Sequence, residues 1–136
     1  AEAAVETDDL GTALGYVNQV RQRAIDSTPI KTMDGSADAA NYDIALYTAF
    51  GSKDEARKAV RMERRLELAM EGHRLFDLRR WNVLVDTMTE YVGNEVRTIP
   101  NFGPKFAGAA NKHNLFPVPV GAIDQSSGTL QQNPEW

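Results

Sequence analysis

The hydrophobic pattern of the chain is clearest between residues 53 and 71, where apolar side chains recur at steps of three and four. Such spacing places side chains on one face of an α-helix, and we expect this face to lie in the core. The positions on this face are Ala59, Met62, Leu66 and Ala69.

The sequence also marks the two ends of this helix. Ser52 followed by Glu55 is a capping box, in which a hydroxyl and a carboxylate satisfy backbone N–H groups, so the helix should begin near Lys53. Gly72 can adopt the left-handed conformation that ends a helix. We therefore predict a second helix from about Arg74 that folds back on the first as a helical hairpin.

Further helices are predicted on both sides of this hairpin. Residues 1–6 are helix formers, and Thr7 or Asp8 can cap a helix that runs to about Arg23. Beyond Gly72 an apolar face at helical spacing continues to Gly93, with a bend at the Trp-Asn junction of residues 81–82.

Breaker residues predict long irregular segments between and after these helices. Residues 26–51 contain Pro29 and Gly35 and should form a loop, apart from a short helix at residues 41–50. Residues 93–112 should also be irregular, with a short strand at 96–99. The alternating prolines of residues 115–119 force an extended geometry, and Trp136 is free to dock nearby. The predicted fold is all-α with long irregular loops and an extended C-terminal segment.

Composition narrows the class of protein. With 136 residues, the chain can form one domain over residues 1–136 and hardly two. A formal charge of -4 with both signs interspersed disfavours non-specific nucleic-acid binding. Cysteine is absent, which excludes disulfides, thiolate metal sites and a cysteine nucleophile. No apolar run approaches the roughly 20 residues that a membrane-spanning helix needs.

Three glutamates at i,i+4 spacing, Glu63, Glu67 and Glu71, are the first candidates for chemistry. A retaining glycosidase needs two carboxyl groups about 5 to 5.5 Å apart that face a sugar from opposite sides. Successive turns of one helix point carboxylates in the same direction, and nearby arginines lower both pKa values, whereas the catalytic acid needs a raised one. We therefore expect no catalytic residue here.

A metal site is also disfavoured. Helical carboxylate–histidine sites place Glu and His at i,i+3, and Arg74 stands at that spacing from Glu71, with His73 one residue out of step. We interpret His73 as a packed or capping residue at the helix junction and His113 as a solvated loop residue. The sequence therefore predicts neither a bound metal nor a cofactor.

The glutamate row repels itself by about a few tenths of a kcal/mol per pair, so it needs compensation. We predict an ion network between the two helices, with arginines such as Arg64, Arg79 and Arg80 against the glutamates, and Asp77 paired with Arg74 or Arg80. The predicted structural motif comprises Glu63, Arg64, Glu67, Glu71, Gly72, His73, Asp77, Arg80 and Trp81.

Exposed aromatic rings would matter for a sugar ligand, because pyranose C–H faces stack on them. Phe76 and Trp81 lie on helix faces, so we assign them to the core. Tyr42, Tyr47 and Phe50 lie beside the unpatterned loop and are the candidate ligand-binding residues, with packing of the loop as the alternative role.

The sequence ERRLELAMEGHRLFDLRRW, residues 63–81, resembles the signature of the SusD/RagB family. LFPVP with AID after it, and QNPEW at the end, resemble the C-terminal segment of that family. The resemblance is strong over residues 53–92 and 114–136 and weaker over residues 1–23. Residues 24–51 match no motif of the family.

This resemblance implies a non-catalytic cell-surface lipoprotein of Gram-negative bacteria with tetratricopeptide-like helix packing. Such proteins bind an oligosaccharide or polysaccharide, or a peptide in some members, for a TonB-dependent SusC-like transporter in the outer membrane. The family's N-terminal lipid-bearing cysteine has no counterpart here. We therefore expect a C-terminal fragment of a longer protein, anchored through a region absent from this chain and not itself inserted in the membrane.

The resemblance assigns no sugar-contacting residue to this chain, because the family's binding aromatics generally come from earlier parts of the sequence. The alternative function is a helical-repeat module that binds another protein and no sugar. A groove with two or more exposed aromatics beside amide or carboxylate groups favours a glycan, whereas an apolar patch above about 600 Å² favours a protein partner.

Overall fold

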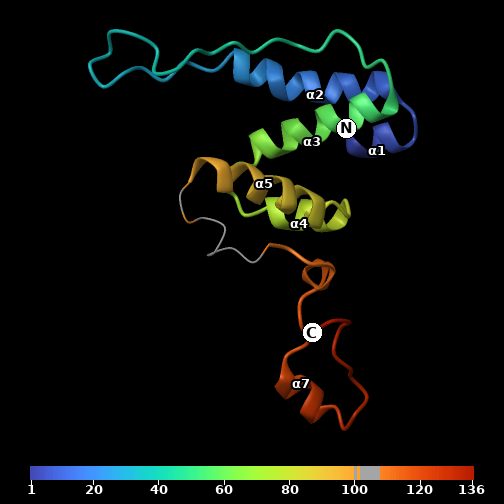
Figure 1. Ribbon diagram of the computed structural model, residues 1–136. Helices are drawn as coiled ribbons and strands as arrows, with labels where there is room; N and C mark the ends of the chain where they lie inside the picture. Colours follow the sequence, from blue (N-terminus) through green and yellow to red (C-terminus); the bar gives the residue numbers. More distant parts are fainter. Residues whose placement is uncertain (100, 102–107) are drawn as a thin grey trace. The chain divides into compact units, whose positions relative to one another are not determined.

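The computed structural model describes residues 1–99, 101 and 108–136, and every regular element within these ranges is a helix (Figure 1). A lone antiparallel bridge joins Lys31 to Asp38. The elements are α1 (Glu2–Glu6), α2 (Leu10–Ile25), α3 (Lys53–Glu67), α4 (Arg74–Arg80), α5 (Leu84–Thr98), the 3-10 helix η1 (Asn111–Asn114) and α7 (Val120–Gln125). The predicted all-α class with long irregular segments is confirmed.

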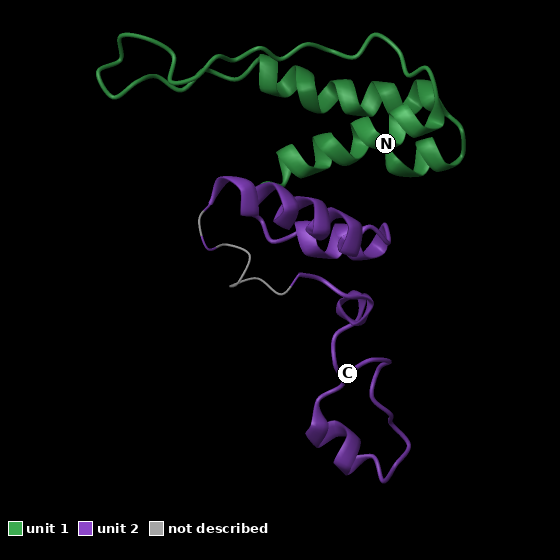
Figure 2. Cartoon of the chain, in the orientation of Figure 1, with its two compact units in different colours: residues 1–69 green, residues 70–136 purple. Residues whose placement is uncertain are grey.

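The chain divides into two compact units, Ala1–Ala69 and Met70–Trp136 (Figure 2). Helices α1, α2 and α3 belong to the first unit, and the remaining helices belong to the second. The single domain and the hairpin between α3 and α4 both stay predictions.

The core of the first unit forms where α1, α2 and α3 meet. Ala13 of α2 and Ala56 of α3 are fully buried, and such small side chains let two helix backbones approach closely. The buried cluster consists of Val5, Ala13, Val17, Ala56 and Val60. With so few large side chains, this core is small, and polar contacts between the helices carry a correspondingly larger share of its specificity.

The predicted core face of α3 is largely wrong. Of its four positions only Ala59 is buried, while Met62 and Leu66 are 47% and 61% exposed. The buried face of α3 is instead rotated toward Ala56, Val60 and Glu63. The apolar pattern misled because Glu63, a charged residue, takes a core position by pairing with an arginine of α2.

The helix starts follow capping chemistry more closely. The predicted cap of α2, Thr7 or Asp8, is wrong, because Asp9 caps the helix by accepting the Thr12 N–H at 3.1 Å. Thr7 instead donates its hydroxyl to the Ala3 carbonyl and closes α1. Ser52 caps α3 as predicted, since its hydroxyl accepts the Glu55 N–H at 3.1 Å. The Glu55 carboxylate accepts the Gly51 N–H at 2.8 Å, whereas a capping box predicts the N–H of the next residue, Ser52, as the donor.

The stop of α3 differs from the prediction. The helix ends at Glu67 and the chain passes through turns before Gly72, which has a φ of 77°. Met70 also has a positive φ, 68°, so the junction contains two left-handed residues rather than one. Gly72 therefore lies in the junction between helices, as predicted, although the helix stops short of it.

The predicted bend after α4 is confirmed as a full break at Trp81–Val83. Asn82 has a φ of 55°, and the Val83 N–H bonds to the Leu78 carbonyl at 3.0 Å, which closes α4 before α5 begins. Helix α5 then continues through Gly93 to Thr98 and packs against α4. The strand predicted at residues 96–99 is therefore wrong, and most of the irregular segment expected up to Lys112 lies outside the described residues.

A clasp of side-chain amides, formed by Gln132 and Asn133, holds the extended C-terminal segment of the second unit. Val118 lies between two prolines and has the only N–H group in residues 117–119. Gln132 accepts that N–H at 2.7 Å and donates to the Val118 carbonyl at 2.9 Å. Asn133 donates to the Phe116 carbonyl at 2.6 Å. The two C-terminal motifs of the sequence therefore bind one another.

Trp136 docks on η1, as predicted for this residue. Its indole N–H donates to the Lys112 carbonyl at 2.9 Å, and its ring meets His113 edge-on with centroids 5.7 Å apart. His113 accepts the Ala110 N–H through Nδ1 at 2.8 Å. The prediction of a merely solvated His113 is wrong, because this imidazole organises the start of η1.

Candidate functional site

Two polar side chains of α2 fasten the end of the long loop to the helix. Asn18 donates to the Tyr47 carbonyl at 2.8 Å and accepts the Tyr47 N–H at 2.9 Å, the two bonds that a neighbouring strand would supply. Arg21 donates through Nε to the Ala45 carbonyl. The helix predicted at residues 41–50 is wrong, because these bonds hold the backbone extended along α2 (Figure 1).

A cavity of about 430 Å³ lies between the C-terminal end of α2 and this loop. Ile30, Ile44 and the ring of Tyr42 contribute apolar walls, and Ser27, Thr28 and Asp38 contribute polar groups. Lys31 pairs with Asp38 at 2.5 Å, next to the bridge that joins the two residues. The cavity therefore combines apolar surface with a few hydrogen-bonding groups, which is typical of a small-ligand site.

The structure separates the three candidate aromatics. Tyr42 is 47% exposed and lines the cavity. Tyr47 and Phe50 pack against the hydrophobic core, with ring centroids 5.5 Å apart, and the Arg21 guanidinium lies 4.8 Å from the Tyr47 ring centre. Packing of the loop thus accounts for Tyr47 and Phe50, and Tyr42 alone remains a ligand candidate of this set.

The partners of the glutamate row differ from the predicted network. Arg21 pairs with Glu63, and Arg23 contacts both carboxylate oxygens of Glu67 at 2.5 and 2.6 Å, so α2 rather than α4 supplies these cations. The two residues of each pair lie more than forty positions apart in the sequence.

The rest of the motif surrounds the junction before α4 and the break after it. Asp77 is buried and accepts the Arg80 Nε–H at 2.9 Å, which confirms one of the two predicted partners. The Arg80 guanidinium lies 4.8 Å from the ring centre of Trp81. His73 occupies the N-cap position of α4, yet its side chain makes no capping bond and lies 4.0 Å from Glu71. Arg64 lines a separate cavity of about 340 Å³ between α1, α2 and α3.

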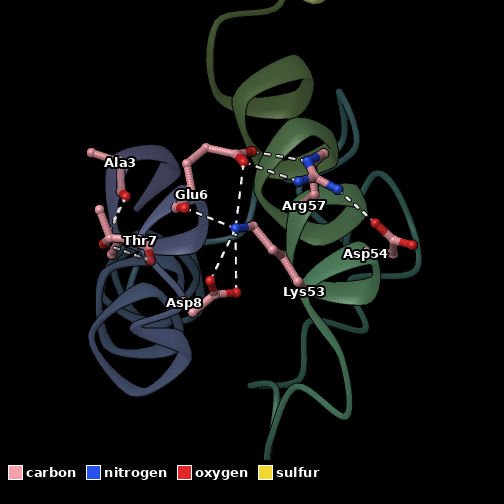
Figure 3. Close-up of polar contacts among 8 residues, drawn as sticks. Ala3, Glu6, Thr7, Asp8, Lys53, Asp54 and Arg57 are labelled. Carbon is pink, nitrogen blue, oxygen red and sulfur yellow. Dashed lines mark hydrogen bonds and ion pairs between the residues drawn. The ribbon is translucent and has the colours of Figure 1, made fainter.

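A charged cluster fastens α1 to the start of α3 (Figure 3). Arg57 donates two bonds of 2.9 Å to Glu6 and a third bond to Asp54. Lys53 donates to the Glu6 carbonyl at 2.8 Å and pairs with Asp8. The hydrogen bonds from Arg57 lower the pKa of Glu6, and the Glu6 carboxylate in turn raises the pKa of Arg57. This cluster is a surface clamp between α1 and the start of α3.

One carboxylate of the loop is also strongly acidic. Asp34 accepts hydrogen bonds from the hydroxyls of Thr32 and Ser36 and from the Ser36 N–H, which lower its pKa to about 2. These bonds make a tight turn around Gly35, whose φ is 71°. Asp34 therefore shapes the tip of the loop and carries a full negative charge at neutral pH.

The described residues contain no group of three or more histidine, aspartate or glutamate side chains placed to hold a metal ion. Of the three glutamates considered for glycoside hydrolysis, Glu63 and Glu67 each pair with an arginine of α2. Within the same ranges, no helix has the length and hydropathy needed to cross a bilayer.

Sequence reasoning missed the two residues that position the loop, Asn18 and Arg21. Their signal was present, since both are polar residues spaced three apart on α2 and therefore share one face of that helix. Helical spacing alone could not show that their partners would be backbone groups of residues 45–47.

Comparison with known proteins identifies the family. The model of the SusD family matches residues 1–136, the whole chain. A SusD-like protein P2 of Formosa agariphila is 30% identical over 122 residues, which cover 90% of this chain and 20% of that protein. No solved structure gave a significant match. The chain therefore belongs to the SusD family, and it spans about a fifth of the length of this relative.

Proposed function

We propose that the chain is part of a non-catalytic binding protein that captures a glycan nutrient for a TonB-dependent SusC-like transporter. The single observation that carries this proposal is the SusD family match over residues 1–136. Proteins of this family generally bind nutrients without chemistry, and the engaged glutamates of α3 agree with that role. The longer protein would lie at the outer-membrane surface, held there by a lipid anchor.

Within this chain, the cavity around Tyr42 supports the proposal best. Its half-exposed ring can stack on the C–H face of a pyranose, while Asp38 and the hydroxyls of Ser27 and Thr28 can bond to sugar hydroxyl groups. Asn18 and Arg21 keep the backbone beyond Tyr42 in place. The loop that forms the site is thus fastened to α2 at residues 45–47.

Replacing Tyr42 by Ala tests this site. We expect binding of the best glycan found on an array to weaken severalfold in isothermal titration calorimetry, because the variant removes the ring face on which a pyranose would stack. Tyr16→Ala is the matched control, since Tyr16 is similarly exposed in the same unit but lines the other cavity. Equal losses in both variants, or none in either, would reject Tyr42 as a ligand contact.

The second candidate function is a protein-interaction module. Among the described residues that line the loop cavity Tyr42 is the one aromatic, fewer than the two expected for a glycan groove, and several large apolar side chains are exposed on the helices. These are Met62 and Leu66 on α3, Leu75 and Phe76 on α4, and Tyr91 and Val96 on α5. The same titration distinguishes the candidates, because a pure interaction module binds none of the glycans on the array.

A further inference from the structure

The loop that forms the cavity is strongly acidic. Residues 24–44 carry four aspartates and one lysine, a formal charge of -3, whereas the whole chain carries only -4. Asp38 lines the cavity, and Asp26 and Asp43 directly adjoin the lining residues Ile25 and Ile44. Among the described residues that line this cavity, none is a lysine or an arginine.

Cations close to the loop already have anionic partners. Lys31 pairs with Asp38, Arg23 with Glu67, and Arg21 with Glu63. Recruiting any of these cations to an anionic ligand would require breaking an existing ion pair. Asp38 lines the cavity and Asp26 and Asp43 adjoin its lining residues, so this loop brings more negative than positive formal charge to the cavity. Charges interact over a screening length of about 8 Å at physiological salt.

We infer that this cavity selects uncharged saccharides and rejects anionic ones such as uronate-containing or sulfated glycans. The inference rests on the proposed function and adds the chemical class of its ligand. A neutral sugar offers C–H faces to Tyr42 and hydroxyl donors to the Asp38 carboxylate, and a carboxylate is a strong acceptor for such donors. A sulfate or uronate brings a like charge toward the Asp38 carboxylate and the adjoining Asp26 and Asp43, and the described lining residues include no lysine or arginine to offset it.

Calorimetric titration of the full 136-residue chain with two matched polymers tests the inference, supported by a wider panel. The matched polymers are hydroxyethyl cellulose and carboxymethyl cellulose, and the panel adds neutral laminarin, xylan and amylose and anionic alginate, polygalacturonate and carrageenan. We expect the tightest ligand to be neutral and the anionic polymers to bind at least tenfold more weakly. Raising the salt concentration should narrow that gap, because salt screens the repulsion.

The double variant Asp26→Asn with Asp43→Asn separates charge from shape. It removes two carboxylates that adjoin the cavity and keeps all of its lining residues, so binding of the anionic polymers should strengthen several-fold while that of the neutral ligand stays unchanged. Asp86→Asn with Glu90→Gln is the control, since it removes the same charge from exposed positions on α5 in the other unit.

The outcomes separate the two proposals. Tighter binding of an anionic polymer, lost in Tyr42→Ala, would overturn the charge selection and leave the glycan-binding site standing. Equal effects of the two double variants would also overturn it, since net charge and not the local field would then decide. A chain that binds no polymer of either kind contradicts the proposed site itself.

Discussion

Two ion pairs between α2 and α3 differ at the residue scale mainly in burial. The side chains of Arg21 and Glu63 are 18% and 11% exposed, whereas those of Arg23 and Glu67 are 68% and 34% exposed. A charge left alone in a buried position keeps its desolvation cost without its partner, whereas an exposed charge is rehydrated by water. The buried Arg21–Glu63 pair should therefore contribute more to the free energy of unfolding than the exposed Arg23–Glu67 pair.

Arg21→Met should lower the free energy of unfolding by about 3 kcal/mol, because it leaves Glu63 buried without its cation and also releases the Ala45 carbonyl. Arg23→Met, the exposed counterpart, should cost less than about 1 kcal/mol. Urea unfolding of both variants measures the difference. Arg21→Met with Glu63→Leu should recover part of the loss, and similar costs for the two single variants would contradict the role assigned to burial.

Local residue contacts were the more predictable ones. The Asp77–Arg80 pair and the Ser52 cap span three residues each, so helical spacing alone identifies them. Glu63 and Glu67 find partners more than forty positions away, and no spacing rule in one sequence reaches that far. For the candidate site, composition indicated Tyr42, but the packing of Tyr47 and Phe50 depends on the position of α2.

Between elements, side-chain amides supply the backbone hydrogen bonds that a neighbouring strand supplies in a sheet. Asn18 holds the backbone of Tyr47, and Gln132 holds that of Val118, each with one donated and one accepted bond. Both targets lie in extended segments, where the described part of the chain offers no strand as a partner. The starts of α3 and α4 were predictable because their signals are local, whereas these extended segments depend on amides from other parts of the chain.

Gln132→Ala should release the extended C-terminal segment without unfolding α4 or α5. The Val118 N–H loses its acceptor, so its hydrogen exchange should accelerate about tenfold, the effect expected from a net loss of one to two hydrogen bonds. Exchange measured by NMR reports this amide directly. Gln131→Ala, at the adjacent exposed position, is the control, and unchanged exchange in Gln132→Ala would show that the clasp does not hold the segment.

On the scale of the whole molecule, the chain is a helical framework that carries an irregular acidic loop. The family signature over residues 63–81 indicated the family because it specifies helix junctions and charge pairs. It says nothing about residues 24–51, which form the loop and its cavity. Framework and family were therefore predictable from the sequence, whereas the site had to come from the structure.

Chemical-shift mapping by NMR shows whether the cavity of the loop holds the glycan. The labelled chain is titrated with its tightest glycan, and the backbone amide signals are followed for every assignable residue. We expect shifts concentrated at Thr28, Ile30, Asp38 and Tyr42, with the glycan recovered intact afterwards. Shifts confined to α4, α5 or the C-terminal segment, or a glycan cleaved during the titration, would contradict this expectation.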